Sequence, residues 1–208
     1  SGDLRLRAEG TLFADKNAAN TYFDFLEIND AGGIGAAGVD AFVNTTEDRH
    51  RLRTRARLQM DVAVAEHVQA GFRVATGNAL DPVSTNQTLA NAGNRFDIQL
   101  DRGWLRFDAR AADDEAWLTL SGGRIANPFT YTNLHFDHDL NFDGAAASVR
   151  HDFAPGDGRN AVYATAGAFG IEEFDFSSRD KWLLGGQLGH EWTPVRDIST
   201  RLAIGYFD

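Results

Sequence analysis

Arginine stands at every second position in one stretch of the chain, and its chemistry is the attraction of anions. Arg51, Arg53, Arg55 and Arg57 lie within the segment RHRLRTRARLQMDVAV at residues 49–64. Because successive side chains of a β-strand point to opposite faces, this spacing places all four guanidinium groups on one face. The other face then carries the apolar residues at even positions, which are Leu52, Ala56, Leu58, Met60 and Val62. The segment is therefore predicted to form one strand of roughly 15 residues, polar on one face and apolar on the other.

Four more arginines lie in other alternating segments, at the positions that point to the polar face. These are Arg5 and Arg7 in residues 4–13, Arg73 in residues 68–74 and Arg106 in residues 95–109. We expect them to line the same polar surface as the first four. Two interpretations remain open, because the arginines could act together as a wall that attracts anions, or could pair with acids and only keep the surface polar.

A second group of residues with possible chemistry lies in the segment DHDLNFD at residues 137–143. Asp137, Asp139 and Asp143 offer alternating carboxylate oxygens, which Ca²⁺ prefers as ligands. The glycine and glutamate spacing is not that of an EF-hand, so this is only a weak calcium candidate. The same acids could instead face the arginines, or lie on a solvated loop surface. No cofactor is predicted.

The segment from Ile125 to Asp139 is predicted to be a long loop that contains a rigid bend. Asn127, Pro128 and Phe129 form this bend, because proline fixes its own backbone and lacks the donor that a strand would need. Tyr131 follows close behind. We expect the loop to fold into the interior of the structure and to form a constriction.

Alternation of apolar and polar residues recurs along most of the chain. Nine strands are predicted, at residues 4–13, 49–64, 68–74, 95–109, 115–124, 141–153, 160–169, 181–192 and 197–207. The fourth changes parity, which predicts a one-residue β-bulge near Arg102. The connections alternate between short turns and long loops, as in outer-membrane barrels, where long loops leave one rim. Trp182 and Trp192 lie ten residues apart on the apolar parity, a spacing that suits two aromatic girdles.

Composition limits the classes of protein to which the chain could belong. It has 208 residues, a net charge of −10, no cysteine and a mean hydropathy of −0.34. The negative charge argues against a nucleic-acid binder, and no run approaches the roughly 18 apolar residues of a membrane-spanning helix. The prediction is an all-β, antiparallel transmembrane β-barrel. Nine strands are too few for a wide channel, so residues 1–208 are expected to be the N-terminal part of one barrel domain of roughly 16 or more strands.

Several motifs resemble the family of putative porins found in Gram-negative outer membranes. They are GDLRLR at residues 2–7, the arginine strand, ATG at 75–77, PVSTNQTL at 82–89, LDR at 100–102, GR at 123–124, NPF at 127–129 and DHDLNFDG at 137–144. Gly103-Trp104 departs from this pattern, which has Ala-Tyr there. The resemblance implies a non-enzymatic channel in the outer membrane that passes small solutes. Its partners would be membrane lipid and lipopolysaccharide, and a homo-oligomer is possible.

Two other classes of protein remain as alternatives. A barrel-borne hydrolase of lipids or esters would need a Ser/His/acid cluster, which the sequence does not supply in any known spacing. A soluble β-sandwich that binds carbohydrate would leave large apolar faces without a partner.

Overall fold

The computed structural model describes residues 1–78, 81–90, 92–111, 116–153, 160–173, 180–195 and 198–208. Ten strands and three short helices follow one another along this part of the chain. They are β1 (Gly2–Thr11), α1 (Phe25–Asp30), α2 (Ile34–Ala37), η1 (Gly38–Ala41), β2 (Arg49–Ala65), β3 (Val68–Thr76), β4 (Gln87–Thr88), β5 (Ile98–Arg110), β6 (Ala116–Ala126), β7 (Asn141–Asp152), β8 (Asn160–Glu172), β9 (Lys181–Val195) and β10 (Ile198–Phe207). None of the helices found there is long and apolar enough to cross a membrane.

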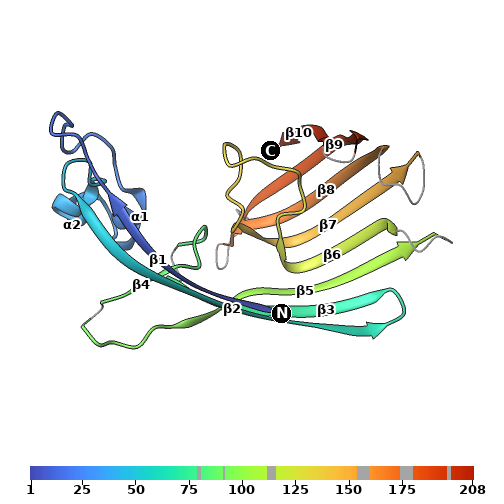
Figure 1. The fold of residues 1–208 in the computed structure, drawn as a ribbon, viewed down its shortest axis with the longest axis horizontal. Helices are drawn as coiled ribbons and strands as arrows, with labels where there is room; N and C mark the ends of the chain where they lie inside the picture. The colour runs from blue at the N-terminus through green and yellow to red at the C-terminus, as the bar shows by residue number, and fades with distance from the viewer. Residues whose placement is uncertain (79–80, 91, 112–115, 154–159, 174–179, 196–197) are drawn as a thin grey trace.

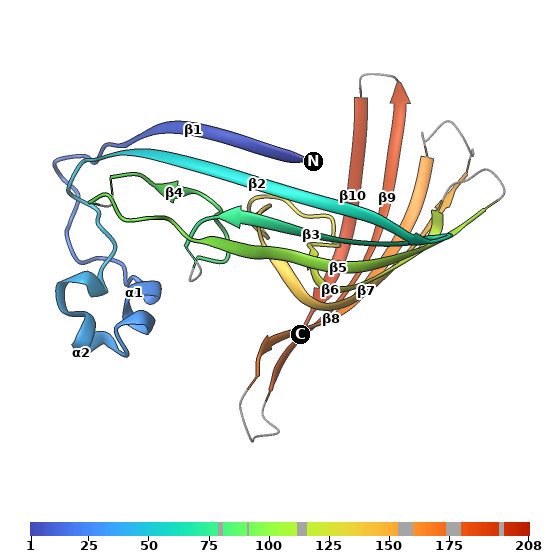
Figure 2. The same cartoon turned by 90° about the horizontal axis from the view of Figure 1, so that it is seen from below.

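All ten strands belong to one antiparallel sheet (Figure 1). Its order is β1-β2-β3-β5-β6-β7-β8-β9-β10, and the short β4 pairs with β2 beside β3. The sheet is not closed, because β1 and β10 are its two edges and do not pair with each other. It is strongly twisted and curled, so that β1 and β2 run across the direction of β9 and β10 (Figure 2).

The predicted all-β, antiparallel fold is confirmed. The nine predicted strands correspond to β1, β2, β3 and β5 to β10, with ends that differ by a few residues. A sandwich needs two sheets packed face to face, whereas these strands form one. Residues 14–48, predicted as an irregular loop, contain α1, α2 and η1, and β4 lies in the second long loop. The turns predicted at 111–114, 154–159 and 193–196 fall wholly or partly outside the described residues.

The predicted bulge is present in β5. Arg73 of β3 lies opposite Arg102, but the next residue, Val74, lies opposite Leu100. Asp101 is therefore the extra residue, and the bulge turns both Asp101 and Arg102 away from the apolar face. The buried Asp101 carboxylate accepts hydrogen bonds from Arg73 and from Nδ2 of Asn141, the latter at 2.8 Å. The bulge thus corrects the parity and adds a carboxylate to the polar face.

The pairing register gives the sheet two chemically different faces. We call the face that carries the Arg51–Arg57 side chains the inner face, and the opposite one the outer face. Large apolar side chains of the outer face are exposed along the sheet, including Leu4, Leu58, Leu100, Leu188 and Ile204, each more than half exposed. A sheet with one solvated polar face normally buries the other against a core. In the described part of the chain no such core covers the outer face, which is what a lipid-facing surface requires.

The largest apolar cluster lies instead between the inner face and the β6–β7 loop (residues 127–140). Its buried centre is Phe129 of this loop, with Ile125, Phe142, Ala146 and Phe169 from the sheet. The ring of Phe129 makes edge-to-face contacts with Phe142, Phe169 and Phe207, at centroid distances of 5.0 to 6.4 Å. A Cβ atom on Gly185 would lie 2.7 Å from the Phe129 ring, so glycine is needed there for the loop to approach β9.

Hydrogen bonds from β8 and β9 hold the same loop in place. The Gln187 side chain, 7% exposed, accepts from the Thr130 backbone N–H at 2.7 Å and donates to the Thr130 carbonyl at 2.8 Å. The Thr130 hydroxyl lies 2.5 Å from the Tyr163 hydroxyl. Apolar contacts and paired backbone groups therefore both fix this loop against the sheet.

Replacing Gln187 with leucine should free the loop without unfolding the sheet. The change leaves the N–H and the carbonyl of Thr130 without their partner, a loss of about 0.5–1.5 kcal/mol for each hydrogen bond. We expect hydrogen exchange of the Thr130 amide, measured in detergent micelles, to accelerate by roughly tenfold or more. Gln69→Leu is the matched control, because Gln69 is an exposed glutamine of β3 on the same face. Equal exchange in the two variants would show that Gln187 does not hold the loop.

Candidate functional site

The arginines of β1 and β2 face one another directly across the strand pair. Arg5 lies opposite Arg55, and Arg7 lies opposite Arg53. Like charges in opposite positions of an antiparallel pair are destabilising. We call Arg5, Arg7, Arg51, Arg53, Arg55 and Arg57 the arginine row. The same register places Asp3 opposite Arg57 and Glu9 opposite Arg51, one carboxylate at each end of this row. These two acids are the carboxylates that the register places nearest to the positive charge of the row.

Each of the two carboxylates serves more than one arginine. Asp3 binds the guanidinium groups of Arg55 and Arg57, at 2.5 and 2.7 Å. Glu9 forms ion pairs with Arg7 and Arg51 and lies 3.7 Å from Arg53. Bidentate and shared arginine–carboxylate contacts fix the geometry of planar guanidinium groups better than single contacts do. The arginines are therefore held in place but are not all neutralised.

Among the described residues, Arg5 is compensated by a side-chain amide rather than by a carboxylate. Its guanidinium donates to the side-chain oxygen of Asn86, and Arg53 donates to the Asn86 carbonyl at 3.2 Å. Ser84 lies 3.5 Å from the same Arg53 group. The loop that carries these residues is placed by β4, which pairs with β2 at Arg53. Sequence reasoning missed this role of the loop, although the Ser-Thr-Asn composition of residues 84–86 signals side chains that bind polar groups.

Arg57 links the arginine row to the β6–β7 loop. Its NH1 group donates to Asp139 at 2.9 Å, and the Asp139 side chain is only 7% exposed. Asp139 lies at the end of the loop whose other end packs on Gly185 of β9. The loop, yellow in Figure 1, therefore contacts both β2 and β9 on the inner face.

The other predicted pore arginines have carboxylates of their own. Arg73 forms a buried ion pair with Asp101, and the Nε atom of Arg106 lies 2.8 Å from Asp108. Both are on the inner face, opposite Gln59 and Ser121 respectively in the strand register. They add polarity to this face but little net charge.

The predicted constriction residues differ in what they contact. The Asn127 side chain accepts from the Phe129 backbone N–H at 2.9 Å, which closes the bend around Pro128. Phe129 is 4% exposed in the aromatic cluster. Tyr131 is half-buried and makes no hydrogen bond or ring contact with the described residues. Asp137 accepts from the backbone N–H of Asp139 at 2.8 Å, and so shapes the end of the loop.

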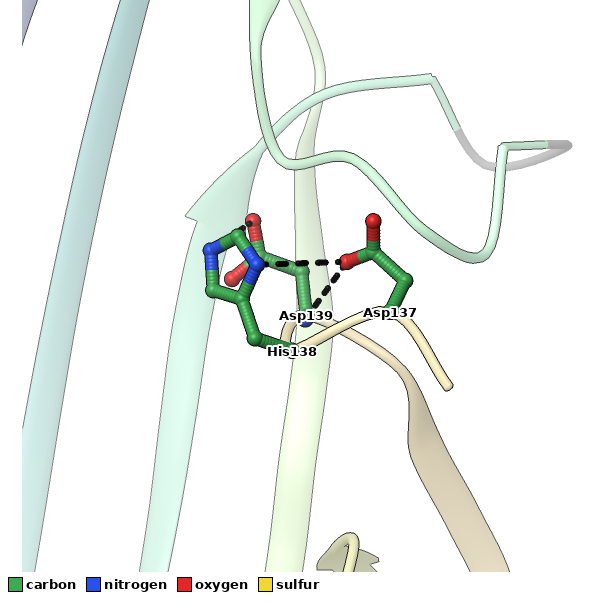
Figure 3. A group of neighbouring side chains, drawn as sticks. All are labelled: Asp137, His138 and Asp139. Carbon is green, nitrogen blue, oxygen red and sulfur yellow. Dashed lines mark hydrogen bonds and ion pairs between the residues drawn. The ribbon is translucent and has the colours of Figure 1, made fainter. Parts of the chain in front are cut away.

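Asp137, His138 and Asp139 form a tight group on this loop (Figure 3). The His138 ring lies 3.5 Å from the Asp137 carboxylate and 3.7 Å from that of Asp139. The predicted calcium candidate differs from this group, because Asp143 lies on β7 and forms an ion pair with Arg124 at 2.6 Å. A cation would have to compete with the Arg57 guanidinium for Asp139. Of the three predicted acids, Asp139 is the one that contacts the arginines of β1 and β2.

Around the arginine row, cations exceed anions. Six arginines gather there, namely Arg5, Arg7, Arg51, Arg53, Arg55 and Arg57, and the carboxylates that pair with them in the described part of the chain are Asp3, Glu9 and Asp139. This excess of positive charge lies on one face of a chain whose net charge is −10. Such a surface can attract a small anion from solution.

A family model described as "Putative porin" matches residues 1–208, which is the whole chain. No curated protein matches it. The match agrees with the antiparallel sheet, with its apolar outer face and polar inner face, and with long connections that leave one rim. The chain belongs to the putative porin family, and it is therefore a porin-like channel component of the outer membrane.

Proposed function

We propose that this protein is a passive diffusion channel that favours small anions. The observation that carries the proposal is the excess of arginine over carboxylate along β1 and β2. Fixed cations on a channel wall raise the local concentration of anions and lower that of cations. The shared ion pairs hold the guanidinium groups at the wall, so the field needs no reorganisation when a solute passes.

The β6–β7 loop supplies the constriction in this proposal. It rests on the inner face between Arg57 and Gly185, where the Arg57–Asp139 ion pair fixes one end and aromatic packing with the Gln187 hydrogen bonds fixes the other. A segment fixed across the inner face reduces the free cross-section of a lumen. The outer face would contact membrane lipid through the exposed apolar residues of even parity in β2.

The two faces of β2 should tolerate arginine very differently. Leu58→Arg places a charge on the lipid-facing side and should destabilise the folded protein by about 2–4 kcal/mol near mid-membrane. Gln59→Arg, one residue later and on the inner face, is the matched control and should cost no more than about 1 kcal/mol, from its position opposite Arg73. Denaturant unfolding in lipid vesicles measures both. Equal losses would show that the outer face does not contact lipid.

Removing charge from the arginine row should shift ion selectivity toward cations. We expect the double variant Arg53→Gln and Arg55→Gln to move the reversal potential in a salt gradient in the cation-selective direction, because two fixed cations are lost. The measurement uses the full-length protein in planar bilayers. Arg95→Gln is the control, since Arg95 is an exposed arginine of a loop. An unchanged reversal potential in the double variant would mean that these arginines serve only the structure.

Shortening the β6–β7 loop should widen the channel. Deletion of residues 130–135 removes the middle of the loop, including the Thr130 contacts with Gln187, while Asp139 and its Arg57 ion pair remain. Single-channel conductance should rise, and larger solutes should enter proteoliposomes, because less of the inner face is covered. Circular dichroism checks that the sheet is intact. Unchanged conductance in a folded variant would place the constriction elsewhere.

A further inference from the structure

A cavity of about 390 Å³ lies against the inner face where the β6–β7 loop begins. It is lined by Arg102, Trp104 and Arg106 of β5, by Thr119 and Ser121 of β6, and by Pro128 of the loop. Its volume falls within the range of small-molecule sites, which combine apolar walls with a few polar groups. Neither the arginine row nor the loop contacts described above explain this cavity.

Arg102 is the cation in this cavity that lacks a carboxylate. Its Nε atom donates to the Asn141 side-chain oxygen at 2.7 Å. No carboxylate of the residues that the structure describes forms an ion pair with it, since Asp101 pairs with Arg73 and Asp139 pairs with Arg57. The two nearby carboxylates, Asp101 and Asp139, are thus each engaged by another arginine, and a half-buried guanidinium without an ion pair of its own favours an anionic ligand.

Arg106, at the other end of the wall, is already compensated. Its Nε atom lies 2.8 Å from Asp108, which also accepts a hydrogen bond from the Thr119 hydroxyl at 2.7 Å. Arg102 and Arg106 are four residues apart in one strand, a separation of roughly 13 Å at about 3.3 Å per residue. Because Arg106 already has a carboxylate partner in Asp108, the anionic group of a ligand belongs at Arg102.

Trp104 provides an apolar wall next to that arginine. It lies opposite Gly71 of β3, and a Cβ atom on Gly71 would be 2.6 Å from the Trp104 ring. The indole therefore covers a glycine, and Trp104 also packs against the buried apolar cluster around Phe129. A ring fixed in this way can stack with a planar ligand at low entropic cost. Arg102 and Trp104 are two residues apart on one face, roughly 7 Å along the strand.

We propose that this cavity binds a small carboxylate that carries a single aromatic ring, as a step in passage through the channel. The carboxylate would pair with Arg102, and the ring would lie between Trp104 and Pro128. The spacing of Arg102 and Trp104 along the strand suits one ring bonded to one carboxyl group. The hydroxyl of Ser121 lines the same cavity and can bind a polar substituent. The proposal rests on the proposed diffusion function and names a class of solute for it.

The test uses the full-length protein in planar bilayers, with sodium benzoate as the probe. Conductance in potassium chloride is measured first, and benzoate is then titrated. We expect saturable block by benzoate, and block by acetate, benzyl alcohol or inorganic phosphate that is at least tenfold weaker, because each lacks the ring, the charge or the planar carboxylate. Isothermal titration calorimetry of benzoate in detergent micelles measures the same binding without conduction.

Two variants assign the parts of the site. Arg102→Gln should weaken benzoate binding by roughly tenfold or more, as expected when a charge-assisted pair is lost. Trp104→Leu should weaken benzoate binding but leave the weak effect of acetate unchanged, because only the ring contact is lost. Arg95→Gln removes an exposed loop arginine and should leave benzoate binding unchanged.

The outcomes separate this inference from the proposed function. A channel that conducts but is blocked equally by benzoate, acetate and phosphate, or whose Arg102→Gln variant binds benzoate normally, would overturn the inference alone. A folded protein that conducts no ions but binds benzoate through Arg102 in calorimetry would overturn the diffusion function and support the site.

Discussion

The sharing of few carboxylates among many arginines is the constraint on which the rest of the inner face depends. Arg5 and Arg7 lie directly opposite Arg55 and Arg53, an arrangement that would push β1 and β2 apart without compensation. Asp3 and Glu9 supply part of it, and both lie on β1 itself. The remainder comes from loops, which are consequently drawn onto the sheet. The charge pattern of one strand pair therefore decides where two distant loops settle.

The two long loops after β3 and β6 both pack on the inner face, but through different interactions. Residues 84–86 reach the arginine row with amide, hydroxyl and backbone oxygens, which compensate charge without cancelling it. The β6–β7 loop contributes a real counter-charge through Asp139, but at one end only. Its other end is held by uncharged contacts, because Phe129 fits where Gly185 lacks a side chain and Thr130 exchanges hydrogen bonds with Gln187. One loop thus preserves the positive field, and the other limits the space in which it acts.

Sequence pattern predicted the strands well because each strand has one apolar and one polar face, and register errors would expose the wrong face. Alternation also revealed the bulge in β5, since the apolar residues change parity around Asp101. Alternation could not reveal which arginine meets which acid, because ion pairs such as Arg57 with Asp139 join residues 82 positions apart. It also missed α1, α2 and β4, which are too short to carry a period. The glycines under Phe129 and Trp104 were visible in the sequence, but only the partner ring explains them.

The inner face is chemically divided along the sheet. Its arginine-rich part lies on β1 and β2, whereas β7 to β9 present small and aromatic residues such as Ala146, Phe169 and Gly185 beside the β6–β7 loop, and their Arg150 is paired with Asp152 and Glu191. Fixed charge concentrated on one side of a lumen produces a field across the path of the solute rather than a uniform attraction. A solute with a charged end and an apolar end would be oriented by such a field. Arg102 and Trp104 lie on β5, between the two parts, and the cavity beside them is where both ends of such a solute would find a partner at once.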